Sequence, residues 1–111
     1  MNDWDTEVRD GVAVVRTPQR LDMVAAPRLK RLLDQVVQEG HMRIVADLTG
    51  TAFVDSSGLG ALVGGLKTAR QAGGDLRLAA DGEQVLTVLS LTNLDRILRP
   101  HPGVQDALDG W

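Results

Sequence analysis

The chain has 111 residues, with 12 Lys and Arg against 15 Asp and Glu, so its formal net charge is −3. This length suits a single domain, placed at residues 1–111, and the weak acidity argues against non-specific binding of nucleic acid or anionic membranes. Only 3% of the residues are aromatic and cysteine is absent, which argues against base stacking and excludes disulfides, thiol catalysis and Cys-based metal sites.

The first third of the chain predicts a β-hairpin followed by a helix. Asp10-Gly11 between runs of β-forming residues is a strong hairpin signal, with the second strand over residues 12–16. After a loop, apolar residues recur at helical spacing up to Gly40, which suits a left-handed position after the helix. Asp22 offers an N-cap for this helix, although a proline in the first turns places the start nearer Ala25.

The middle third is organised around Asp55-Ser56-Ser57-Gly58. A nearly continuous apolar run over residues 42–48 predicts a strand that is buried on both faces, and Phe53-Val54 lead into the motif. From residue 59 to residue 72 the hydrophobic period is helical, and Gly73-Gly74 ends that helix.

The last third predicts a strand, a helix, a short strand and a final helix. Alternation over residues 75–80 indicates the first strand, and Asp81 is the expected cap of a helix that ends at Asn93. Ile97-Leu98 is the expected last strand, and a helix follows Pro102. Because parallel neighbours need crossovers, this alternation predicts an α/β fold with a mostly parallel sheet.

Enzyme and cofactor motifs are not found in the sequence. The two histidines, His41 and His101, are not spaced at i, i+4, and the chain has no cysteine that could complete a metal site with them. We therefore expect both to be solvated loop residues and expect no metal site. The residues around Ser56 do not form Gly-x-Ser-x-Gly, and Gly58-x-Gly60 belongs neither to a Walker loop nor to a dinucleotide fingerprint. We therefore expect no catalytic residue and no cofactor. No apolar run approaches the ~18 residues of a membrane helix, and the acidic start lacks a signal-peptide core, so a cytoplasmic protein is expected.

Two interpretations of Asp55-Ser56-Ser57-Gly58 remain open on the residues alone. Asp and Ser at a strand-to-helix junction commonly cap the helix. A serine at a helix N-terminus can also carry a phosphate, because the helix dipole and the free N–H groups stabilise the added charge of about −1.5 to −2. Phosphorylation there would place a dianion beside Asp55 and repel a docked partner.

The helix after the motif carries Gly60, Gly64 and Gly65 in its interior, where each glycine costs up to about 1 kcal/mol relative to alanine. One interpretation is close packing of this helix against a neighbour within the domain. The other is a smooth surface on which another protein can lie. Both hold if different glycines serve each purpose.

The sequence also resembles a known family. The residues that carry the resemblance are Asp47-Leu48-Thr49, Phe53-Val54-Asp55-Ser56-Ser57-Gly58-Leu59-Gly60, Gly73-Gly74, Val85-x-x-x-Leu89-x-x-Thr92-x-Leu94, Ile97-Leu98 and Ala107-Leu108. Over about residues 5–109, this pattern is similar to the STAS domain of bacterial anti-sigma factor antagonists. The resemblance implies a small α/β domain with a mixed, mostly parallel sheet of four or five strands and helices packed mainly on one face.

The resemblance also implies a regulatory function without catalysis. Family members bind an anti-sigma factor that is also a serine kinase, which releases the sigma factor. The kinase uses its own bound ATP to phosphorylate the first serine of the motif, here Ser56, and a serine phosphatase resets the switch. The implied docking surface consists of Asp22, Asp55, Ser57, Gly58, Leu59 and Gly60.

Two alternatives and one departure bear on this interpretation. STAS modules also serve in lipid transporters and in stress-signalling scaffolds, where the phosphate switch is absent. A small hydrolase that uses Ser56 is disfavoured because neither histidine lies in a catalytic context. The loop that often reads Gly-Glu-Leu-Asp in the family reads Gln-Arg-Leu-Asp over residues 19–22, which puts Arg20 where a carboxylate is usual. That charge could change the choice of partner or attract a phosphate on Ser56.

Overall fold

The structure is a computed structural model, and it describes residues 5–111. Residues 1–4 of the predicted domain lie outside the described part. The strands are β1 (Asp5–Arg9), β2 (Val12–Arg16), β3 (Arg20–Leu21), β4 (Arg43–Asp47), β5 (Phe53–Val54), β6 (Asp75–Ala79) and β7 (Pro100–His101). The helices are α1 (Ala26–Gln38), α2 (Ser56–Gln71), α3 (Glu83–Leu91) and α4 (Val104–Leu108), with a short 3-10 helix, η1, at Leu94–Arg96.

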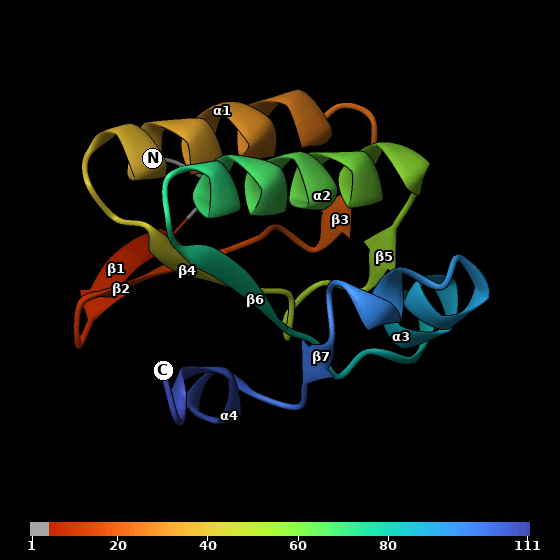
Figure 1. The fold of residues 1–111 in the computed structure, drawn as a ribbon. Helices are drawn as coiled ribbons and strands as arrows, with labels where there is room; N and C mark the ends of the chain where they lie inside the picture. Colours follow the sequence, from red (N-terminus) through yellow and green to blue (C-terminus); the bar gives the residue numbers. More distant parts are fainter. Residues whose placement is uncertain (1–4) are drawn as a thin grey trace.

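The main sheet has five strands in the order β1-β2-β4-β6-β7. The β1–β2 hairpin is antiparallel, and β2, β4, β6 and β7 pair in parallel. Helices α1 and α2 lie side by side over one face of this sheet, and α4 lies across the other (Figure 1). The predicted mixed, mostly parallel α/β fold with helices mainly on one face is therefore confirmed.

Strand β4 shows why its residues form a continuous apolar run. Ile44 and Ala46 belong to the large core under α1 and α2, whereas Val45 belongs to a smaller cluster on the opposite face, with Ala107 of α4. Because successive side chains of a strand point to opposite faces, both sets must be apolar. The prediction of a strand buried on both faces is confirmed.

A second, two-stranded parallel sheet pairs β3 with β5, with Leu21 opposite Val54. The sequence predicted Phe53-Val54 as extended but gave no signal for a strand at Arg20-Leu21, because two residues are too few to show a period. This small sheet lies beyond the main one, beside the start of α2 (Figure 1). It brings the loop before α1 next to the Asp55-Ser56-Ser57-Gly58 motif.

The structure corrects three helix and strand boundaries. Helix α1 begins at Ala26, and Asp22 heads the preceding turn, accepting hydrogen bonds from the N–H groups of Val24 and Ala25 at 3.1 and 3.3 Å. Gly82, rather than Asp81, is the N-cap of α3. The predicted strand at Ile97-Leu98 is wrong: the left-handed Asn93 starts η1, and the Leu98 N–H still donates to the Leu94 carbonyl.

The last strand forms instead at Pro100–His101, at the edge of the main sheet. Proline lacks an N–H donor and is suited to such an edge, and it holds the residue before it in extended conformation. The final helix is confirmed at residues 104–108. The side chain of Arg77 in β6 anchors it by donating to the carbonyls of Ala107 and Asp109.

Candidate functional site

The junction between β5 and α2 is built by Asp55. Its side chain accepts a hydrogen bond from the Gly58 N–H at 2.9 Å, and its carbonyl accepts one from the Leu59 N–H at 3.0 Å. Asp55 is therefore the N-cap of α2, as the capping interpretation predicts. Ser56 and Ser57 are the first two residues of the helix, and both are exposed.

The loop before α1 meets this junction through the small β3–β5 sheet. The Asp55 N–H donates to the carbonyl of Leu21 at 3.3 Å, so Asp22 and Asp55 follow directly after the ends of two neighbouring parallel strands. Gly58 packs against the same carbonyl: a Cβ there would lie 2.8 Å from the Leu21 Cγ and closer still to its carbonyl oxygen. Only glycine fits this close approach.

The charges at Asp22 are arranged by its own turn and by Arg20. The hydrogen bond from the Ala25 N–H lowers the pKa of the Asp22 carboxyl, and the Val24 N–H and the Arg20 guanidinium lower it further. The Arg20 Nε lies 3.6 Å from Asp22, and its guanidinium lies 4.4 Å from the centre of the Phe53 ring. The positive charge that departs from the family pattern is thus placed beside Asp22.

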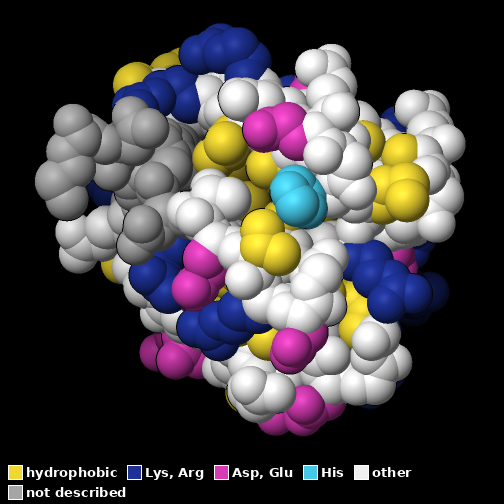
Figure 2. Space-filling model, turned by 90° about the vertical axis from the view of Figure 1, so that its left-hand side faces the viewer, with side chains coloured by type: hydrophobic (Ala, Val, Ile, Leu, Met, Phe, Trp, Pro, Cys, Tyr) yellow, Lys and Arg dark blue, Asp and Glu magenta, His cyan; other side chains and the backbone are white. Residues whose placement is uncertain are grey.

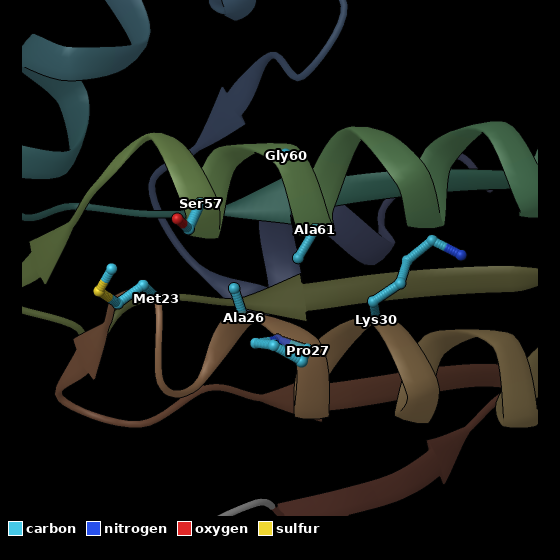
Figure 3. A pocket seen from close by; sticks show the side chains of 7 residues that line it. All are labelled: Met23, Ala26, Pro27, Lys30, Ser57, Gly60 and Ala61. Atoms are coloured by element: carbon cyan, nitrogen blue, oxygen red, sulfur yellow. The ribbon is translucent and has the colours of Figure 1, made fainter.

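A groove runs between α1 and α2 on one side of this junction (Figure 3). Its volume is about 310 Å³, and it is lined by Met23, Ala26, Pro27, Lys30, Ser57, Gly60 and Ala61. Met23, which is 69% exposed, and Ser57 lie at the same end of this α1–α2 groove (Figure 3). Lys30 is held in an ion pair with Asp34 at 2.7 Å.

A second groove runs along the other side of α2, toward η1. Its volume is about 410 Å³, and it is lined by Ser56, Leu59, Gly60, Val63, Gly64, Lys67, Thr92 and Leu94. This α2–η1 groove is mostly apolar, and the polar side chains among its lining residues are those of Ser56, Lys67 and Thr92. Gly60 lines both grooves, and a Cβ at this position would meet nothing within 4 Å. The ridge between the grooves is therefore low and open.

The glycines of α2 serve both purposes that the sequence left open. Gly58 packs on Leu21, and a Cβ on Gly65 would collide with the side chain of Leu33 in α1. Gly60 faces open space. Close packing within the domain thus accounts for Gly58 and Gly65, and a low, accessible surface for Gly60.

The structure brings all seven candidate site residues to one end of the molecule, but not all to the surface. Ser56, Ser57 and Gly60 are exposed, Asp22 and Asp55 are half-buried, and Gly58 and Leu59 are buried. Gly58 therefore belongs to the packing beneath the turn, and Leu59, although buried, lines the α2–η1 groove. Sequence reasoning had Gly60 and Gly64 on a candidate docking surface but missed the groove residues contributed by other elements. Met23-Val24, two adjacent apolar residues directly after Asp22, are a signal for an exposed apolar patch.

Metal-ligating groups and membrane-spanning helices can be looked for within residues 5–111. Among residues 5–111 there is no group of three or more His, Cys, Asp and Glu side chains that could hold a metal ion. No helix in this part of the chain is long and apolar enough to cross a membrane. The end of the molecule opposite the start of α2 shows positive and negative side chains intermixed, with apolar side chains in separate patches (Figure 2).

Comparison with known proteins identifies the family. The model of the STAS domain matches residues 3–107. A Thermotoga maritima protein assigned as an anti-sigma factor antagonist is 31% identical over 104 residues, which cover 93% of this chain and 92% of that protein. The anti-sigma-B factor antagonist of Staphylococcus aureus is 26% identical over 101 residues, 91% of this chain and 94% of that one.

A solved structure agrees with these sequence matches. The crystal structure of an anti-sigma factor antagonist from Mycobacterium paratuberculosis has a TM-score of 0.85 at 31% identity, and covers 95% of this chain and 89% of that one. The resemblance seen in the sequence is confirmed over nearly the whole length. The chain belongs to the STAS domain family.

Proposed function

We propose that this protein is an anti-sigma factor antagonist that docks on an anti-sigma factor through the start of α2 and is switched off by phosphorylation of Ser56. Relatives that match over nine-tenths of the chain are named as such antagonists. The partner in this proposal is a serine kinase that brings its own ATP, and a serine phosphatase reverses the modification. Because a sigma factor acts on RNA polymerase, this function belongs in the cytoplasm.

The observation that carries the proposal is the position of Ser56. It is exposed at the first position of a 16-residue helix, beside an apolar groove, on a turn whose backbone is fixed by the Asp55 cap and by the packing of Gly58. A kinase can reach its hydroxyl without unfolding the domain. No histidine is found among the residues that line the two grooves, so a regulatory role explains this serine better than catalysis.

Charge provides the switch. A phosphate on Ser56 brings a charge of about −1.5 to −2 to a helix N-terminus, where the dipole and free N–H groups stabilise it. The same charge follows Asp55 directly in the chain, just after the β3–β5 pair, and lies beside the mostly apolar α2–η1 groove. A partner that docks there would have to bury a dianion, so binding is lost while the fold is kept.

The test uses the purified anti-sigma kinase with ATP. We expect mass spectrometry to find one phosphate, on Ser56, and binding to fall by tenfold or more after modification. Ser56→Ala should bind the kinase as the wild type does and accept no phosphate. Ser56→Asp should bind much more weakly, because a carboxylate mimics part of the added charge.

Ser57 provides the matched control. It is exposed on the same turn but lines the α1–α2 groove instead of the α2–η1 groove. Ser57→Ala should still be phosphorylated on Ser56. A phosphate found on Ser57 alone, or a Ser56→Asp variant that binds as tightly as the wild type, would contradict the proposal.

A further inference from the structure

Strand β5 has one edge that no other strand within residues 5–111 covers. Its Phe53 and Asp55 N–H groups donate to the carbonyls of Gln19 and Leu21 in and beside β3. Because N–H and C=O groups alternate along a strand, those of Val54 point to the opposite edge. Val54 is 1% exposed, so its two backbone groups are withdrawn from water and need partners within the protein.

Gln84, in the first turn of α3, supplies both partners. Its Oε1 accepts a hydrogen bond from the Val54 N–H, and its Nε2 donates to the Val54 carbonyl, each at 2.9 Å. One side-chain amide thus replaces a neighbouring strand on this edge. The start of α3 is also close to the turn before β5, since a Cβ on Gly82 would lie 3.2 Å from the Thr51 carbonyl oxygen.

We propose that Gln84 is the positioning residue of the phosphorylation site. Val54 is followed directly by the Asp55 cap and by Ser56, so the backbone that Gln84 holds leads into the reacting hydroxyl. β3 fixes this short strand from one edge and Gln84 fixes it from the other. This inference rests on the proposed function, because it assigns to Gln84 the orientation of Ser56 toward the kinase.

Phosphoryl transfer is sensitive to this orientation. The Ser56 hydroxyl oxygen bonds to the γ-phosphorus of the kinase-bound ATP while the bond from that phosphorus to ADP breaks, ADP leaves, and the hydroxyl proton passes to a base on the kinase. The attacking oxygen must lie in line with the bond to ADP, and a displacement of about 1 Å can lower the rate by on the order of a hundredfold. The residues that line the two grooves do not include Gln84. Loss of Gln84 should therefore impair the transfer step more than docking.

The test compares Gln84→Leu, which removes both hydrogen bonds, with Gln84→Glu, which retains an acceptor for the Val54 N–H but no donor at pH 7. Amide exchange should show at least a tenfold faster exchange of Val54 in Gln84→Leu. With the anti-sigma kinase and ATP, kcat for phosphorylation of Ser56 should fall about tenfold, with KM within about twofold. Gln84→Glu should lie between Gln84→Leu and the wild type.

Thr68→Val is the control for a merely structural effect. It removes the half-buried hydroxyl of Thr68, which lies 3.1 Å from its acceptors on Asp34 and on the Gly64 carbonyl, in α2 but far from Ser56. It should lower thermal stability without changing kcat. The positioning role is overturned if Val54 exchange is unchanged in Gln84→Leu, or if kcat changes no more than in Thr68→Val. Should the wild type accept no phosphate, the proposed function fails, while the exchange of Val54 still reports whether Gln84 holds the strand.

Discussion

Helix α2 has one side packed against the sheet and α1, and another that carries Ser56, Ser57 and Gly60 at the surface. Small residues occur on both sides, for different reasons. On the packed side, Gly58 and Gly65 let neighbouring atoms approach where a side chain would collide, and on the exposed side Gly60 meets nothing. A fixed underside allows the exposed turn to keep one shape while a partner binds or a phosphate is added.

The largest effect is expected on the packed side. Leu62 is fully buried in the core, and Leu62→Ala should lower the free energy of unfolding by about 2–5 kcal/mol through lost burial and a cavity. Urea unfolding at pH 7 measures the change. Leu91→Ala makes the same substitution at a residue that is 78% exposed, and should alter stability by less than about 0.5 kcal/mol. Equal losses of unfolding free energy in Leu62→Ala and Leu91→Ala would contradict the view that the packed side of α2 carries the stability.

Gly58→Ala should have the next largest effect. The added methyl group would press on the carbonyl and side chain of Leu21, and backbone atoms cannot move aside as a flexible side chain can. We expect a loss of about 1–3 kcal/mol, although alanine normally favours a helix. Thermal or urea unfolding tests this prediction. A Gly58→Ala variant more stable than the wild type would contradict the close packing of Gly58 against Leu21.

Much of this organisation could be predicted from the sequence. Asp10-Gly11 predicts the β1–β2 hairpin, and both residues have the positive φ that such a turn requires. The continuous apolar run predicts the strand that the structure has over residues 43–47. The position of Asp55 and Ser56 at a strand-to-helix junction followed from the same periodicity. These features depend on residues that are close in the sequence, so local sequence patterns predict them.

The features that were predicted wrongly or missed depend on contacts between residues far apart in the sequence. Ile97-Leu98 has the composition of a strand, but the chain turns through η1 and pairs only at residues 100–101. The bonds between Gln84 and Val54 join residues 30 positions apart, and no local pattern marks Gln84. Both grooves likewise combine α2 with a second element, so their lining residues became visible only in the structure.

Gly60→Ala sharpens the comparison because stability and binding should change in opposite directions. The position is exposed and has space for a methyl group, so alanine should raise the free energy of unfolding by up to about 1 kcal/mol. The same methyl group would raise the ridge between the two grooves and weaken binding of the anti-sigma factor by several-fold. Calorimetric titration measures the binding, and Gln71→Ala, at the far exposed end of α2, should leave it unchanged. Tighter binding by Gly60→Ala would argue against docking on this ridge.

The smallest effect on stability is expected at Asp22, in the loop before α1 that lies next to the start of α2. The Ala25 N–H, with the Val24 N–H and the Arg20 guanidinium, lowers the pKa of its carboxyl below the ordinary value of 3.8. A lowered pKa means that the folded protein favours the carboxylate. The stabilisation is present above the ordinary pKa, and is lost as the pH falls through the lower pKa of the folded state.

Asp22→Asn should therefore be slightly less stable than the wild type at pH 7, and this difference should shrink below about pH 4. Urea unfolding of both proteins at pH 7 and at pH 3 measures the difference. Gln71→Ala, at the exposed end of α2, changes no titratable group and should show no such change with pH. If the difference at Asp22 grew as the pH fell, the hydrogen bonds to its carboxylate would not be the cause. The same hydrogen bonds hold the turn that carries Met23. If Asp22→Asn is less stable than the wild type at pH 7, we therefore also expect it to bind the anti-sigma factor more weakly at the α1–α2 groove.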